Sequence, residues 1–146
     1  MSYDLSMLIT YNDKSVYYGQ KDSILTIQIN DRKYRVKWGR AWSEPGNLPR
    51  EGYIADHLLS AGFLQGIKTK RVPILADKVE YTDDKSTRYT EVIKPGSFIH
   101  GILIKFMEEK RVYVIAHFEQ GQSEHYMVPK IGKFGVLNPL TSQNSK

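Results

Sequence analysis

The chain has 146 residues, of which 40% are hydrophobic and 25% charged, as in an ordinary globular domain. It contains no cysteine, which excludes disulfides, thiolate nucleophiles and zinc sites built on cysteine. Lys and Arg number 21 against 16 acidic residues, and the resulting net charge of +5 favours an anionic partner such as nucleic acid.

The length predicts one domain, residues 1–137, followed by a polar C-terminal tail at residues 138–146. No apolar run is long enough to cross a bilayer, and the acidic opening Met1–Asp4 is unlike a signal peptide. We therefore expect a cytoplasmic protein that does not bind a membrane.

Strands are predicted on both sides of a Pro- and Gly-containing loop at residues 39–50. Before this loop we expect them at Met1–Tyr11, Ser15–Gly19, Ile24–Ile29 and Lys33–Trp38. After residue 67 we expect them at Lys68–Leu75, Lys78–Thr82, Thr87–Ile93, Phe98–Phe106, Val112–Phe118 and Glu124–Val128. Asn30–Asp31 tolerates left-handed backbone, so the third and fourth segments are predicted to form a β-hairpin.

One helix is predicted, at Glu51–Gln65. Pro49 suits the start of a helix, and Gly66 can end one in a left-handed cap. Ile54, Leu58 and Ala61 recur at helical spacing and would form an apolar stripe. The order of elements therefore predicts an α+β fold, in which one packed helix covers one face of a twisted antiparallel sheet.

The predicted hairpin carries the first candidate site, a basic strip that could follow a phosphate backbone. In this strip Trp42 could stack on a base. Tyr34, Val36 and Trp38 alternate with the cations and are expected to face the core. The strip is then either a nucleic-acid contact or a solvated outer face. It consists of Arg32, Lys33, Arg35, Lys37, Arg40 and Trp42.

Two further basic segments are candidates. Lys68–Arg71 follows the predicted helix. It could contact nucleic acid, but we slightly prefer to interpret it as the ordinary exposed start of a strand. Pro129–Gly135 combines two lysines with two glycines, which would let the backbone approach a phosphate closely. The second segment is equally consistent with a β-bulge or a turn.

The histidines give one weak catalytic candidate. His57 lies on the predicted helix and could act as a general base in RNA cleavage, although a surface histidine is the simpler interpretation. His100, His117 and a carboxylate could form a metal site only if neighbouring strands brought them together, and His100 is more simply a hydrogen-bonded core residue. We expect no metal and no cofactor.

One segment resembles a known family. A strand enters the turn Lys94–Ser97, and Phe98 then opens an alternating strand that ends in Lys105–Phe106. This pattern resembles the RAMP superfamily, the repeat-associated subunits of CRISPR effector complexes. The basic Gly-rich segment near residue 132 is similar to one near the end of such subunits. The resemblance implies a ferredoxin-like fold and guide-RNA contacts by Lys94, Lys130, Gly132 and Lys133.

These observations favour a non-catalytic nucleic-acid-binding protein, with RNA as the favoured ligand. It would be a subunit of a ribonucleoprotein or of a defence-related assembly, together with protein partners. An alternative is a small interaction or inhibitor protein of phage or viral type that acts on a protein partner. A third hypothesis is a metal-independent ribonuclease that uses His57.

Overall fold

The computed structural model describes residues 7–20, 23–62 and 64–134. Of these residues 58% lie in strands and 4% in a single short helix, so the protein is a β-rich structure of two sheets. The predicted α+β fold with a packed helix is therefore wrong, and the ferredoxin-like arrangement is not found. The polar tail predicted at residues 138–146 lies outside the described residues.

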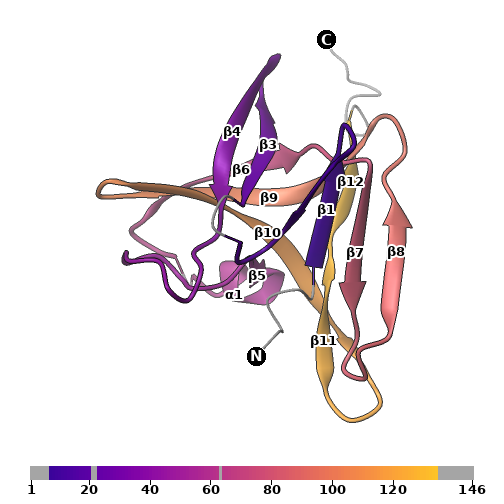
Figure 1. Cartoon of the computed structure of the whole chain (residues 1–146). Helices are drawn as coiled ribbons and strands as arrows, with labels where there is room; N and C mark the ends of the chain where they lie inside the picture. Colours follow the sequence, from indigo (N-terminus) through magenta and orange to yellow (C-terminus); the bar gives the residue numbers. More distant parts are fainter. Residues whose placement is uncertain (1–6, 21–22, 63, 135–146) are drawn as a thin grey trace.

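The smaller sheet has four strands in the order β2-β1-β7-β8, and all its pairs are antiparallel. It stands on the right of the molecule in Figure 1. Its strands are β1 (Met7–Tyr11), β2 (Lys14–Tyr17), β7 (Lys78–Thr82) and β8 (Arg88–Val92).

The larger sheet has eight strands and closes on itself. Its order is β11-β10-β4-β3-β6-β9-β12; β5 pairs with β10, and β10 also pairs with β9. Strands β10, β4, β3, β6 and β9 therefore form a closed ring. The bounds are β3 (Ile24–Ile29), β4 (Arg32–Trp38), β5 (Tyr53–Ala55), β6 (Lys68–Ile74), β9 (Ser97–Phe106), β10 (Glu109–Gln120), β11 (His125–Pro129) and β12 (Ile131–Lys133).

The β3–β4 hairpin is confirmed. The two strands pair antiparallel from Ile24↔Lys37 to Ile29↔Arg32, and Asn30 has a positive φ of 58° at the turn. Val36 and Trp38 are buried as predicted, but the prediction for Tyr34 is wrong, because its side chain is 42% exposed. The tip of the hairpin projects away from the ring (Figure 1). Side chains near the tip therefore have no second sheet or helix packed against them.

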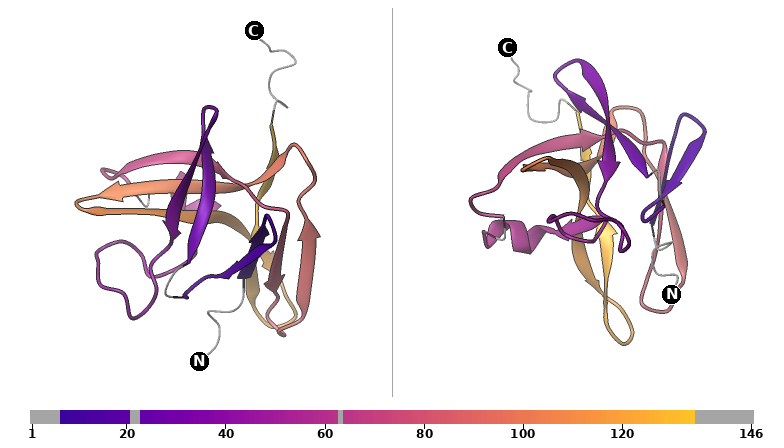
Figure 2. Two further views of the ribbon diagram at one scale, coloured as in Figure 1. Left: turned by 45° about the horizontal axis from the view of Figure 1, so that its top comes forward. Right: turned by 60° about the vertical axis from the view of Figure 1, so that its left-hand side comes forward.

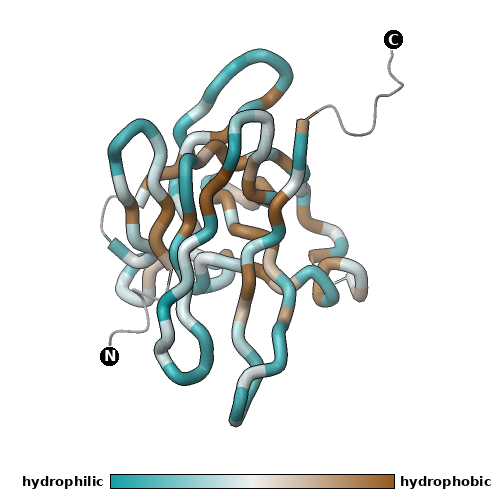
Figure 3. Tube along the Cα trace, turned by 90° about the vertical axis from the view of Figure 1, so that its right-hand side faces the viewer, coloured by the Kyte–Doolittle hydropathy of each residue, from teal (hydrophilic) through white to brown (hydrophobic). Residues whose placement is uncertain are grey.

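Strand β10 is buried on both of its faces. Val112 and Val114 belong to the core between the ring and the four-stranded sheet, whereas Tyr113 and Ile115 belong to a second core. The second core is covered by residues 48–62 and 64–67, which include the helix α1 (Asp56–Ser60). Helix α1 lies on the side of the ring away from the four-stranded sheet (Figures 1 and 2). Hydrophobic positions gather in the middle of the strands, and hydrophilic ones at the hairpin tips (Figure 3).

The helix predicted at Glu51–Gln65 is replaced by the short strand β5 and the five-residue helix α1. Ile54 pairs in parallel with Ile115 of β10 and is buried there. Leu58, which the helical stripe would bury, is instead 38% exposed. Pairing with a buried strand has overridden the helical periodicity of this segment, because β5 satisfies backbone groups of β10 that a helix would leave without partners.

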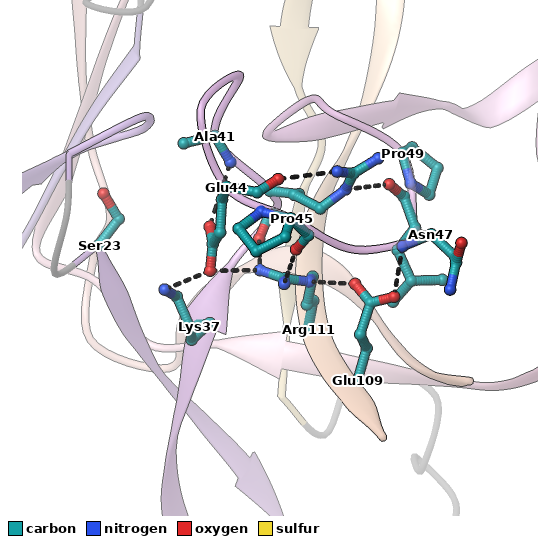
Figure 4. A network of polar contacts seen from close by, with 12 residues as sticks. Ser23, Lys37, Ala41, Glu44, Pro45, Asn47, Pro49, Glu109 and Arg111 are labelled. Atoms are coloured by element: carbon teal, nitrogen blue, oxygen red, sulfur yellow. Dashed lines mark hydrogen bonds and ion pairs between the residues drawn. The ribbon is translucent and has the colours of Figure 1, made fainter. Parts of the chain in front are cut away.

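A buried arginine fastens the loop at residues 39–50 to the ring (Figure 4). The Arg111 side chain is 8% exposed and forms ion pairs with Glu44 at 3.0 Å and Glu109 at 2.9 Å. It also donates a hydrogen bond to the carbonyl oxygen of Gly39 at 3.0 Å. Burial disfavours the charge on both carboxylates, but hydrogen bonds from Arg111 and other donors outweigh this and lower the pKa of Glu44 and of Glu109.

Among the described residues, no helix has the length and apolar character needed to cross a membrane.

We predict that Arg111→Met lowers the free energy of unfolding at neutral pH by about 3 kcal/mol, because two carboxylates lose a buried partner. The folded-state pKa of each glutamate lies below its unfolded value of 4.5. The network therefore makes its full contribution to the free energy of unfolding above that pH, and this contribution is lost as the pH falls below it. The difference between variant and wild type should therefore shrink in acid. Urea unfolding across this pH range measures it.

Lys78→Met is the control, since Lys78 is exposed on β7 and has no acidic partner in the described part of the chain. An Arg111→Met protein as stable as the control at neutral pH would contradict the role given to the network.

Candidate nucleic-acid interface

Three lysines lie directly opposite one another on three adjacent strands of the ring. Lys105 of β9 faces Lys68 of β6 on one side and Lys110 of β10 on the other. Residues in such register share one face of the sheet, with Cβ atoms about 5 Å apart. The pairing therefore forms a row of positive charge across the sheet.

This row continues the inner face of the ring. One step along the strands toward the core, the same face carries Lys70, Leu103 and Val112, which also lie opposite one another. Val112 is fully buried in the core and Leu103 packs against it, whereas the lysines are exposed. The exposed continuation of the inner face therefore carries four lysines. We call them the lysine cluster: Lys68, Lys70, Lys105 and Lys110.

The lysine cluster lacks counter-charges. No ion pair joins any of its four ammonium groups to an acid in the described part of the protein. The nearby Glu109 is engaged by Arg111. Like charges directly opposite on neighbouring strands destabilise a sheet, so a row of three lysines costs stability that a bound polyanion would restore.

The β3–β4 hairpin is a separate projection of the ring with exposed side chains of its own. Its tip and the tip of the β9–β10 hairpin point in different directions from the ring (Figures 1 and 2). Arg32 and Tyr34 continue the face of Val36 and Trp38, and both are exposed. Tyr34 is therefore an aromatic side chain available for stacking that the sequence pattern had placed in the core.

The predicted basic strip is divided by the structure. Lys33, Arg35 and Lys37 occupy the face of β4 opposite Arg32. Lys37 forms an ion pair with Glu44, and the Lys33 ammonium lies 5.8 Å from the centre of the Tyr11 ring.

Arg40 of the predicted strip is buried and structural. It donates hydrogen bonds to the carbonyl oxygens of Leu48 at 2.5 Å and Glu44 at 2.8 Å, which shape the loop at residues 39–50. Trp42 of the strip is 62% exposed, but it lines a cavity elsewhere on the molecule.

The two segments that carry the family resemblance come together. Lys133 of β12 lies opposite Ser97 of β9, so Lys133 and the Lys94–Ser97 turn lie close to each other, and both lysines are exposed. The turn itself is confirmed by a hydrogen bond from the Ser97 N–H to the Lys94 carbonyl oxygen and by a φ of 88° at Gly96.

Lys130 and Gly132 are in packed surroundings. The Lys130 ammonium lies 2.7 Å from an Asp56 carboxylate oxygen, so its charge is compensated. A Cβ atom on Gly132 would lie 2.9 Å from the Phe98 ring, so glycine is needed there for close packing. This explains the glycine without a ligand.

None of the histidine candidates is part of the lysine cluster. The His57 ring packs against Phe118, with 5.1 Å between ring centres, and its side chain makes no hydrogen bond to the described residues. His117 interacts with Glu119 at 2.8 Å. His100 is half-buried, and this burial, aided by nearby Lys130 and Arg71, lowers its pKa. Within the described ranges no group of three metal-binding side chains occurs.

Sequence reasoning missed the lysine cluster because its members belong to three separate segments. Lys68–Arg71 is recognisable as a basic segment, but Lys105 and Lys110 are isolated lysines in the sequence. Only the cross-strand register brings them to Lys68, and a register is not fixed by the alternation within one strand.

No protein-family model, no curated protein and no solved structure matches the chain.

We predict that Lys105→Gln raises the free energy of unfolding by about 0.5 kcal/mol at low salt, because it removes the central charge of the row. High salt should abolish the gain, since the repulsion is exposed to solvent. Lys78→Gln is the matched control. Chemical denaturation at two salt concentrations measures the effect, and a Lys105→Gln protein less stable than the control would show that the row is not repulsive.

Proposed function

We propose that the protein binds nucleic acid through the lysine cluster. The observation that carries this proposal is the row of Lys68, Lys105 and Lys110, three uncompensated cations held in register on one face. Regularly spaced ammonium groups suit a phosphate backbone, and binding would release the counter-ions condensed on it. The cluster thereby gains the negative charge that the fold itself does not provide.

The same face offers an apolar contact beside the charge, and the β3–β4 hairpin of the same ring offers an aromatic one. Leu103 is partly buried next to the row, and Tyr34 is exposed on the adjoining hairpin. Stacking on such a tyrosine requires an unpaired base, because bases within a duplex are already stacked. This favours a single strand as the ligand.

RNA is favoured over DNA on the sequence resemblance alone. The resemblance also supports the wider proposal of a non-catalytic subunit in a ribonucleoprotein or a defence-related assembly. If that is so, Lys94 and Lys133 form a second, smaller contact beside the Pro-Gly turn.

The test compares two triple variants that remove the same net charge. Fluorescence anisotropy with a short single-stranded RNA, repeated with DNA of the same sequence, gives the affinity at several salt concentrations. The cluster variant carries Lys68→Gln, Lys105→Gln and Lys110→Gln. The control variant carries Lys14→Gln, Lys78→Gln and Lys85→Gln, three exposed lysines on the four-stranded sheet and its turn.

We expect the cluster variant to bind at least roughly tenfold more weakly, because it loses three phosphate contacts. Its slope of log affinity against log salt should fall by about 2. The control variant should keep a slope close to that of the wild type. Equal losses in both variants would mean that only net charge matters, and the proposed interface would be abandoned.

A further inference from the structure

A cavity of about 500 Å³ lies away from the lysine cluster. Its walls come from Met7 of β1, from Tyr18, from the loop at residues 42–52 with strand β5, from the end of β7 with the β7–β8 turn, and from the β10–β11 hairpin. Asp84 joins the last two walls, since its carboxylate accepts hydrogen bonds from the backbone N–H groups of Ser123 at 2.8 Å and Glu124 at 3.1 Å. These hydrogen bonds hold two walls of the cavity together.

Aromatic side chains form much of the lining. They are Tyr18, Trp42, Tyr53, Tyr81, Phe118 and Tyr126. The Trp42 ring already accepts one cation, because the Arg50 guanidinium lies 5.9 Å from its centre. Aromatic faces attract cations through the ring quadrupole, most strongly when the cation is only weakly hydrated.

The charge of the cavity is opposite to that of the whole protein. Its lining holds the carboxylates of Glu51, Asp83, Asp84 and Glu124, and one guanidinium, that of Arg50. The net charge of the chain is +5. Hydrogen bonds from backbone amides, foremost that of Ser123, lower the pKa of Asp84, so this group stays ionised.

Glu51 and Glu124 are the lining acids whose carboxylates have no internal role. Asp83 and Asp84 accept hydrogen bonds that shape turns, whereas the Glu51 and Glu124 carboxylates have no hydrogen bond or ion pair within the described residues. Desolvation by the surrounding side chains raises the pKa of Glu51. A positive charge bound beside it would reverse that penalty.

We propose that this cavity binds a methylated ammonium group, with Glu51 as its counter-ion and the aromatic side chains, Trp42 foremost, around its methyl groups. The aromatic walls suit a bulky, weakly hydrated cation better than a metal ion, which prefers several converging oxygen ligands. The four carboxylates disfavour phosphate, so the site is separate from the nucleic-acid interface. The proposal therefore does not depend on the proposed function.

Choline is the probe, and isothermal titration calorimetry with the full chain measures its binding. The uncharged isostere, in which carbon replaces the quaternary nitrogen, controls for shape. The chain has two tryptophans, and Trp38 is buried, so choline should also change the fluorescence of the exposed Trp42. A peptide that carries trimethyl-lysine, compared with its unmodified form, distinguishes a protein side chain from a free small molecule as the source of the group.

We expect saturable binding of choline and at least roughly tenfold weaker binding of the isostere. Glu51→Gln should weaken choline binding by a similar factor, while Glu108→Gln, an exposed acid at the β9–β10 tip, should leave it unchanged. Trp42→Leu should abolish the fluorescence change. Unchanged thermal unfolding of the Glu51 and Trp42 variants would show that they fold.

Tighter binding of the trimethyl-lysine peptide than of its unmodified form would also support the site, and would assign the group to a protein. Equal binding of choline and its isostere would show an apolar cavity without cation recognition and would overturn the proposal. Absence of binding by choline and by the methylated peptide would overturn it as well, and so would a Glu51→Gln protein that binds as well as the wild type.

Discussion

The structure depends on strand β10, which has twelve residues and pairs with four other strands. Its central residues, Val112 to Ala116, are fully buried. A strand that is buried on both faces needs a covering layer on each side. The four-stranded sheet and the rest of the ring cover one side of β10, and residues 48–62 and 64–67 cover the other. This requirement explains why the segment after Pro49 forms a strand beside β10 instead of a long helix. The Arg111 network then holds the preceding loop in place.

The same constraint separates two surfaces of opposite charge. At one end of strands β6, β9 and β10, the face that elsewhere lines the core is exposed to solvent. The register of these strands places the lysine cluster on that exposed part. At the other end of β10, the hairpin to β11 meets the β7–β8 turn and encloses the acidic, aromatic cavity. A polyanion and an organic cation could therefore be bound without competing. The basic character of the whole chain hides this division, because net charge sums over both surfaces.

The sequence predicted local structure better than it predicted architecture. The β3–β4 hairpin and the Lys94–Ser97 turn follow from short-range chemistry, a left-handed Asn30 and a glycine at position 96, and both are present. The prediction of a helix at Glu51–Gln65 was wrong, because the apolar residues at helical spacing cover β10 instead. The basic strip was only partly informative, since Arg40 serves the loop and Lys37 is paired. The lysine cluster depends on pairing between distant segments, which no single stretch of sequence encodes.

We propose that nucleic acid binds on the exposed continuation of the inner face of strands β6, β9 and β10. An NMR titration of the isotope-labelled protein with a short single-stranded RNA tests this most directly, because it maps the backbone amides that shift. We expect the largest shifts at Lys68–Arg71, Leu103–Phe106 and Glu109–Arg111. Shifts confined to the neighbourhood of His57, or the absence of any shift, would contradict it.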